Sequence, residues 1–245
     1  MRIGCVQYLN AQPLIHGWPS EVHFEHPAAL CRMLAEGELD VALVSSFEFL
    51  RNPIYSIVDD VCVAADGPVF SVFVAHRARV ENASEITADP NSLTSVNLLR
   101  CLLAERGWPA QVVDGEADAK LLIGDQAIRF REVHGSQYDY WDLAAEWKHT
   151  TGLPFVFALW LIRPGTPDAS TLAQRLRQLR DRNLATLDEV IAAQPGFAPE
   201  FCNRYFRQHL RFHFGEAEKH GLLRFRLLCE KHALLPRDSK PWPFL

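Results

Sequence analysis

The sequence predicts a two-lobed α/β protein whose C-terminal third is helical. From residue 1 to about 165, short apolar runs alternate with helical patterns, which is typical of an α/β protein with largely parallel sheets. After Pro164 no further strand is predicted, and helical patterns follow. A helical third after two α/β stretches indicates a chain that leaves one lobe, builds a second and returns to the first.

Length and composition fit this class. The chain has 245 residues, enough for two lobes of ordinary size, and its 48% hydrophobic and 22% charged residues are typical of a globular protein. The net charge of −5, without a long basic run, argues against nucleic acid as a partner. No apolar stretch is as long as a membrane span, so we expect no membrane partner.

The cysteines and the first residues indicate a reducing compartment. The six cysteines are scattered and lie mostly in apolar runs, so we expect reduced core residues instead of disulfides. The chain opens on Met1 and a strand-like run without the pattern of a secretory signal. We therefore expect a cytoplasmic protein. The sequence does not predict its oligomeric state.

Apolar runs bounded by turn residues predict the strands. They are 3–6, 39–44, 61–65, 69–76, 86–88, 111–113, 120–123 and 155–162. Apolar residues at helical spacing predict the helices. They are 27–36, 94–106, 168–193, 198–212 and 216–234.

The order of these elements predicts the lobes. We expect lobe one to contain residues 1–80 and 164–245, and lobe two residues 81–163. The segments 74–85 and 155–163 are then the two crossings between the lobes. Ligand sites favour domain interfaces and the carboxyl ends of parallel strands, so the cleft between the lobes is the expected ligand site.

Asn10 is the first candidate for that site, because it follows the first predicted strand. Its amide group both donates and accepts hydrogen bonds, so it can hold a hydroxyl or a carboxylate in a fixed orientation. An equally reasonable interpretation is that Asn10 caps the helix that follows. The sequence alone leaves both open.

Two pairs of hydroxyl residues stand where helices begin. Ser45 and Ser46 follow a buried strand, and Thr94 and Ser95 open a helix of the second lobe. Hydroxyls beside the free N–H groups of a helix start bind anions. The ordinary alternative for such residues is a helix N-cap. Two pairs on facing lobes predict a ligand with two carboxylates.

Three further candidates lie in or after turn segments. Ser71 follows the turn signal at 66–68, and Gly124 and Asp125 follow a later strand. Gly124 indicates a close backbone approach, whereas Asp125 is either a base or a helix cap. The same two alternatives apply to Asp66.

Metal and nucleotide sites are not predicted. His209 and His213 lie four residues apart on a predicted helix, but the segment lacks the glutamate of the zincin motif. Neither a Walker loop nor a G-x-G-x-x-G segment is present. A cluster of aromatic residues is predicted to pack on an amphipathic helix. Its members are Tyr138, Tyr140, Trp141 and Trp147.

Five segments together closely resemble the chorismate dehydratase family of the futalosine route to menaquinone. They are 7–14 (Gln-Tyr-Leu-Asn-Ala-Gln-Pro-Leu), 37–46 (Gly-Glu-Leu-Asp-Val-Ala-Leu-Val-Ser-Ser), 64–69 (Ala-Ala-Asp-Gly-Pro-Val), 121–125 (Leu-Leu-Ile-Gly-Asp) and 151–160 (Thr-Gly-Leu-Pro-Phe-Val-Phe-Ala-Leu-Trp). The resemblance covers at least residues 1–163. It implies a periplasmic-binding-protein-like (type II) fold that is used as an enzyme.

The resemblance implies a hydro-lyase reaction, in which chorismate gives 3-[(1-carboxyvinyl)oxy]benzoate and water. Aromatisation drives this elimination, so no cofactor or metal is expected. The protein has to fix both carboxylates, orient the departing hydroxyl and exclude bulk water. We expect Asn10 to be the catalytic residue that orients the ring. The expected substrate-binding residues are Ser45, Ser46, Ser71, Thr94, Ser95, Gly124 and Asp125.

The general base stays open between Asp125, Glu48 and the enolpyruvyl carboxylate of the substrate. Two other functions also stay open. The sibling enzyme that makes 1,4-dihydroxy-6-naphthoate shares the fold but is expected to carry a catalytic histidine where this chain has Gly124 and Asp125. A non-catalytic cytoplasmic protein that binds a small dicarboxylate is the second, because this fold most often serves solute capture.

Overall fold

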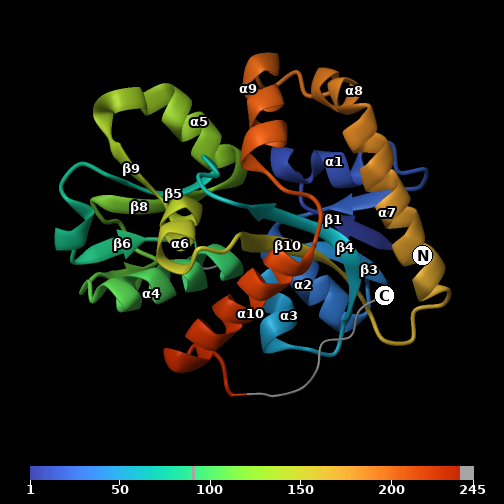
Figure 1. Cartoon of the computed structure of the whole chain (residues 1–245), viewed down its shortest axis with the longest axis horizontal. Coiled ribbons are helices and arrows are strands. Elements are labelled where there is room, and N and C mark those ends of the chain that lie inside the picture. The colour runs from blue at the N-terminus through green and yellow to red at the C-terminus, as the bar shows by residue number, and fades with distance from the viewer. Residues whose placement is uncertain (90–91, 238–245) are drawn as a thin grey trace.

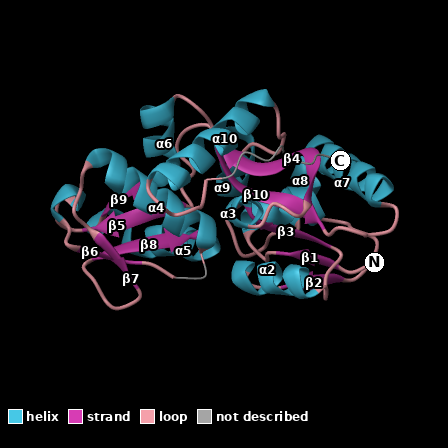
Figure 2. Cartoon of the chain, turned by 90° about the horizontal axis from the view of Figure 1, so that it is seen from below, coloured by secondary structure: helices cyan, strands magenta, loops and turns pink. Residues whose placement is uncertain are grey.

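Two five-stranded sheets lie side by side and form the cores of two lobes (Figures 1 and 2). The computed structural model describes residues 1–89 and 92–237. The prediction of an α/β protein with two lobes and a helical C-terminal third is confirmed.

The first sheet carries the N-terminal strands. In spatial order it contains β2 (Val22–Phe24), β1 (Ile3–Cys5), β3 (Val41–Ser45), β10 (Phe155–Ile162) and β4 (Ser56–Ala65). β1 is parallel to β2 and β3, whereas β10 is antiparallel to β3 and β4. Every residue of β3 is buried, as its uninterrupted apolar run predicts.

The second sheet is built from the middle of the chain. In spatial order it contains β7 (Gln111–Val113), β6 (Glu85–Thr87), β8 (Ala119–Ile123), β5 (Val72–His76) and β9 (Asp139–Asp142). β6 is parallel to β7 and β8, whereas β5 is antiparallel to β8 and β9.

Helices connect the strands and form the C-terminal third. The α-helices of the lobes are α1 (Gln12–Ile15), α2 (Pro27–Glu36), α3 (Ser46–Arg51), α4 (Leu93–Arg106), α5 (Gly124–His134) and α6 (Leu143–Thr151). The C-terminal ones are α7 (Ala169–Ala185), α8 (Leu187–Ala192), α9 (Pro199–Arg204) and α10 (Glu216–Lys231). Shorter turns are the 3₁₀ segments Leu9–Ala11, Val80–Asn82 and Gly135–Gln137 and the π-helix Tyr205–His209.

Both sheets are mixed, so the expectation of largely parallel sheets is wrong. The reason is visible at β10, where Ala158 pairs with Ser45 at the last residue of β3. The chain returns from the second lobe at the edge where β3 ends, and it therefore runs back along β3 in the opposite direction. In the second sheet, Val72 at the start of β5 pairs with Ile123 at the end of β8. The chain enters that sheet where β8 ends, so β5 is antiparallel to β8.

The strand pairing also moves the crossings between the lobes. β5 belongs to the second sheet and β10 to the first, whereas the predicted boundaries at 80/81 and 163/164 place each strand in the other lobe. The chain crosses instead at 66–71, after β4, and at 152–154, before β10. A long apolar strand next to a crossing has the same pattern in either sheet, so the sequence could not separate these two placements.

Two short strands were not predicted, and the interpretation of the aromatic cluster was partly wrong. β2 and β9 contain no fully buried residue, so neither carries a clear apolar alternation. Tyr140 and Trp141 lie on β9, and Tyr138 directly precedes it, whereas Trp147 lies on α6. The ring of Tyr140 packs edge-on against Phe73 of β5, with centroids 4.9 Å apart. A strand, and not a helix, therefore presents most of this cluster.

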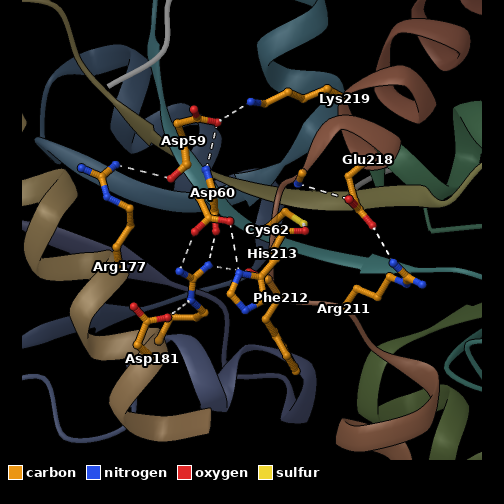
Figure 3. Close-up of polar contacts among 12 residues, drawn as sticks. Asp59, Asp60, Cys62, Arg177, Asp181, Arg211, Phe212, His213, Glu218 and Lys219 are labelled. Carbon is orange, nitrogen blue, oxygen red and sulfur yellow. Dashed lines mark hydrogen bonds and ion pairs between the residues drawn. The ribbon is translucent and has the colours of Figure 1, made fainter. Parts of the chain in front are cut away.

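Polar contacts around Asp60 join the C-terminal helices to the first sheet (Figure 3). Arg180 of α7 is 1% exposed and donates to a carboxylate oxygen of Asp60 at 2.8 Å and of Asp181 at 2.7 Å. It also donates to the backbone carbonyl oxygens of Asp60 and Phe212. His213 lies 3.1 Å from the other carboxylate oxygen of Asp60. These contacts hold α7 and segment 212–213 against β4.

We expect Asp60→Asn to lower the free energy of unfolding by about 2 kcal/mol, measured by urea unfolding at neutral pH. The substitution leaves the buried guanidinium with Asp181 as its one carboxylate. The loss should be smaller than for a fully buried pair because the Asp60 side chain is 47% exposed. Asparagine tolerates the positive φ of 62° at this position, so backbone strain does not add to the effect.

The same pair makes stability depend on pH. Burial raises the pKa of Asp60, but hydrogen bonds from Arg180 and His213 outweigh it and leave the pKa below its ordinary value. The stabilisation is therefore present above the unfolded pKa of about 3.9 and is lost as pH falls through the folded value. Asp188→Asn is the control, because Asp188 forms an exposed ion pair with Arg207. Equal losses in both variants would contradict this account.

Candidate functional site

A cavity lies between the lobes. Most of its wall is apolar, and its polar lining consists of hydroxyl, amide and backbone groups. The lining residues that bear a polar side chain are Tyr8, Asn10, Ser45, Ser71, Ser92, Thr94 and Ser95, and Gly124 contributes backbone. Of the predicted site residues, six therefore line one cavity. Ser46 and Asp125 do not.

Strand ends bring these groups together. Tyr8 and Asn10 follow β1, Ser45 is the last residue of β3, and Gly124 follows β8. β1 and β3 are parallel, so their carboxyl ends meet at one edge of the first sheet, and β8 of the second sheet ends at the same cavity.

The hydroxyls of Ser45 and Thr94 touch directly across the lobe boundary. Their Oγ and Oγ1 atoms are 2.5 Å apart, and both side chains are buried. The two pairs of hydroxyl residues were expected to grip opposite ends of a ligand. Instead, the first residue of each pair contacts the other pair, so Ser45 and Thr94 form one wall of the cavity. The second carboxylate needs other partners.

Further hydrogen bonds surround this contact. Thr94 Oγ1 can donate to the carbonyl oxygen of Phe157 at 3.2 Å and accepts the N–H of Phe47 at 3.3 Å. Either hydroxyl can be the donor in the 2.5 Å contact, because the Thr94 proton can point to Ser45 or to Phe157. Ser46 donates to the carbonyl oxygen of Val156 at 2.7 Å and is fully buried. Its role is therefore to hold α3 to β10.

The start of α4 presents donors to the cavity. The first helix-type hydrogen bond runs from the N–H of Val96 to the carbonyl oxygen of Ser92, at 2.9 Å. The N–H groups of the first turn have no acceptor within the helix, and the positive end of the helix dipole lies there. Ser92 and Ser95 add hydroxyls at the same place, and both line the cavity. This end of a 14-residue helix suits a carboxylate.

The helix-cap alternatives do not describe this structure. No side chain caps the 3₁₀ turn or the helix that follow β1, so Asn10 is not a cap. No side-chain cap is formed at the starts of α3, α4 or α5 either. The side chain of Asn10 makes no hydrogen bond to another residue in the described ranges. Its amide is therefore available to a ligand.

Gly124 and Asp125 join the second lobe to the segment after β1. The N–H of Leu9 donates to the carboxylate of Asp125 at 2.8 Å. Gly124 has a φ of +58°, and a Cβ there would lie 3.0 to 3.1 Å from the ring of Tyr8. Burial raises the pKa of Asp125, and it also raises the pKa of Tyr8 above its ordinary value. Asp125 is thus a hydrogen-bond acceptor between the lobes, beside the cavity and not in its wall.

Sequence reasoning missed Tyr205. Its phenol lies on the π-helix and donates to Ser71 Oγ at 2.6 Å, and both residues are fully buried. No motif links two residues that are 134 positions apart. The one local signal, a hydroxyl on a predicted amphipathic helix, is common in ordinary cores.

Ionisable groups are almost absent from the lining. In the part of the chain that the structure describes, no Asp, Glu, His, Lys or Arg lines the cavity. Glu48, a candidate base, is 2% exposed and pairs with Arg51. Asp66 pairs with Lys148 and Arg211. Among the described residues, the one ionisable lining side chain is therefore Tyr8.

The two histidines considered as metal ligands point to different partners. His209 packs on the ring of Phe70, with centroids 4.3 Å apart, and His213 pairs with Asp60. Within residues 1–89 and 92–237, no group of three or more His, Cys, Asp or Glu side chains could hold a metal ion. A search of the same residues finds no helix long and apolar enough to span a membrane.

Two α/β lobes around a cavity, with helices in the C-terminal third, define a periplasmic-binding-protein-like fold. The structure of protein AF1704 from Archaeoglobus fulgidus matches with a TM-score of 0.78 at 19% identity and covers 96% of this chain and 98% of that one. The periplasmic aliphatic sulphonate binding protein SsuA from Escherichia coli matches with a TM-score of 0.66 at 13% identity, covering 99% and 92%. At these identities the likeness shows the fold alone.

Sequence relatives identify the family. The profile of the menaquinone biosynthesis family matches residues 1–231. A chorismate dehydratase from Thermus thermophilus is 32% identical over 257 aligned residues, covering 91% of this chain and 93% of that protein. A chorismate dehydratase from Campylobacter jejuni is 31% identical over 153 residues, covering 62% and 58%. The chain belongs to the menaquinone biosynthesis family.

We expect Gly124→Ala to destabilise the protein by more than Gly152→Ala does, measured by thermal or urea unfolding. Both glycines have positive φ, of +58° and +73°, so each alanine carries backbone strain on the order of 1 kcal/mol. At residue 152 a Cβ meets nothing within 4 Å, whereas at residue 124 it meets the Tyr8 ring. Equal losses of stability would show that the Tyr8 ring moves away from the added Cβ without a loss in the free energy of unfolding.

Proposed function

We propose that this protein converts chorismate to 3-[(1-carboxyvinyl)oxy]benzoate and water, as a chorismate dehydratase of menaquinone biosynthesis. The observation that carries the proposal is the cavity between the lobes. It is lined by hydroxyls, an amide and the N–H groups of a helix start, with no charged side chain among the described lining residues. The family membership and the relatives named chorismate dehydratase support the choice of substrate.

The lining suits a ligand with two carboxylates in different environments. One carboxylate fits the start of α4, where Ser95 and the first-turn N–H groups are donors. The other carboxylate can be held by Asn10 and Ser71, which also line the cavity. The apolar lining, which includes Val63 and Phe157, suits a carbon ring and keeps bulk water away.

We propose that the base is the enolpyruvyl carboxylate of the substrate. Glu48 and Asp125, the protein alternatives, are outside the lining and hold Arg51 and the Leu9 N–H respectively. Burial keeps Tyr8 protonated at neutral pH, since its pKa is raised, so it is not a base.

The elimination then balances within the substrate. The enolpyruvyl carboxylate takes the ring proton, and the electron pair of that C–H bond spreads onto the ring carboxylate. The pair returns to form the aromatic ring as the C–O bond breaks, and the hydroxyl leaves as water with the proton that the enolpyruvyl carboxylate has accepted. No oxidation or reduction occurs overall, so the reaction asks for no redox cofactor. The protein contributes orientation and exclusion of water.

Incubation of the purified protein with chorismate tests the proposal. The expected product is 3-[(1-carboxyvinyl)oxy]benzoate, identified by chromatography and mass spectrometry against the synthetic compound. Tight binding of chorismate without conversion would favour a non-catalytic dicarboxylate-binding protein of this fold. Formation of 1,4-dihydroxy-6-naphthoate from its own precursor would favour the sibling enzyme, although no histidine lines the described cavity wall.

We expect Asn10→Ala to lower kcat for chorismate by at least about tenfold while the protein stays folded. The amide has no partner among the described residues, so its removal costs little stability, but the ring loses its orienting group. Steady-state kinetics and thermal unfolding measure the two effects. Asn203→Ala, an exposed residue of α9, is the control. Unchanged turnover in Asn10→Ala would remove Asn10 from the mechanism.

We expect kcat/KM to be nearly independent of pH between roughly pH 6 and 9. The substrate carboxylates are ionised throughout this range, the described lining has no histidine, and the pKa of Tyr8 lies above its ordinary value of about 10. A pH series of initial rates, corrected for enzyme stability at each pH, measures this. A rate that rises or falls through a pKa near 6.5 would indicate an imidazole in the mechanism.

A further inference from the structure

The contact between Tyr205 and Ser71 is a buried polar contact that the proposed mechanism does not yet use. The Tyr205 hydroxyl donates to Ser71 Oγ at 2.6 Å, and neither residue is exposed to bulk water. Ser71 lines the cavity, whereas Tyr205 lies behind it on the C-terminal π-helix. A π-helix inside a helical run is often found at a functional site.

The direction of this hydrogen bond decides what Ser71 can offer. A serine hydroxyl has one proton and two lone pairs, so it can act as donor or acceptor toward a ligand. Here one lone pair receives the phenol proton of Tyr205. Burial raises the pKa of Tyr205, so the phenol keeps that proton. The proton of Ser71 is thereby left for the cavity.

Both partners are held rigidly. The ring of Tyr205 stacks on Phe201, with centroids 5.4 Å apart and planes 18° apart, and also contacts Phe206. The carbonyl oxygen of Ser71 accepts the N–H of Gly124 at 2.8 Å. Phe70, just before it, has a positive φ of 64° and donates its N–H to Asp142 at 2.8 Å.

Ser71 receives a proton from Tyr205 and faces the ligand as a donor. In the other hydroxyl contact of the cavity, between Ser45 and Thr94, either hydroxyl can be the donor. A cavity without a cationic side chain in its described lining depends on such donors to hold a carboxylate.

We propose that Tyr205 is a positioning residue, which directs the Ser71 hydroxyl so that Ser71 donates a hydrogen bond to a carboxylate of the bound substrate. This role rests on the proposed function, because it requires a carboxylate in the cavity. The hydrogen bond from Ser71 to the carboxylate is present both when the substrate binds and during the reaction. Its loss should therefore weaken binding more than it slows the chemical step.

Three variants test this role: Tyr205→Phe, Ser71→Ala and the double variant. With chorismate as substrate, each single variant should raise KM by about tenfold, the loss expected for one hydrogen bond to a charged group, and change kcat little. The double variant should have a KM no higher than the weaker-binding single variant, because both changes remove the same hydrogen bond. Thermal unfolding is recorded for every variant.

Tyr55→Phe is the matched control. Tyr55 is also fully buried, and its hydroxyl accepts a hydrogen bond from Asn52 at 3.3 Å, but it does not line the cavity. This variant loses a buried hydroxyl without touching the site, so KM should stay at the wild-type value.

Several results would overturn the role. They are an unchanged KM in either single variant, KM effects that multiply in the double variant, and a Tyr205→Phe protein that fails to fold while Tyr55→Phe folds. The last result would show that the Tyr205 hydroxyl is required for folding. A wild-type protein that neither converts nor binds chorismate would overturn the proposed function together with this role. Wild-type turnover combined with an unaffected Tyr205→Phe would overturn the role alone.

Discussion

The hydroxyl of Thr94 is a contact point between the two lobes, and the geometry of the cavity depends on it. Thr94 belongs to α4 of the second lobe, yet its Oγ1 contacts Ser45, the N–H of Phe47 and the carbonyl oxygen of Phe157 in the first. This contact brings the start of α4 to the end of β3. The donors at the start of α4 therefore line a cavity together with residues of the first lobe.

The chemistry of the cavity follows from the side chains that line it. Within the described residues the wall carries no charged side chain, so a charged ligand meets oriented hydroxyls, N–H groups and one amide. Hydroxyl, N–H and amide groups keep their protons near neutral pH, so they bind the ligand without a proton transfer. A reaction whose driving force is aromatisation needs a fixed pose and a dry site more than a strong protein base, and this wall supplies both.

The crossings explain why the lobes can share one site. β10 returns to the first sheet along β3, and the segment before β5 carries Ser71 from one lobe to the other. Asp142 holds the N–H groups of Val69 and Phe70 and also caps α6, so this crossing is anchored to the second lobe. The C-terminal helices then reach the crossing from behind through Tyr205.

The sequence by itself determined the α/β class, most strands and the helical C-terminal third, and it pointed to six residues that line the cavity, because these follow from periodicity, turn residues and strand ends. Only the tertiary structure decided which neighbour of a pair serves the cavity: Ser45 lines it, whereas Ser46 bonds to β10. The sheet of β5 and β10, the Leu9 contact of Asp125 and the pairing of Tyr205 with Ser71 were likewise decided by packing. Local patterns report how a segment folds, whereas these pairings join segments that are distant along the chain, and no local pattern encodes which of them meet.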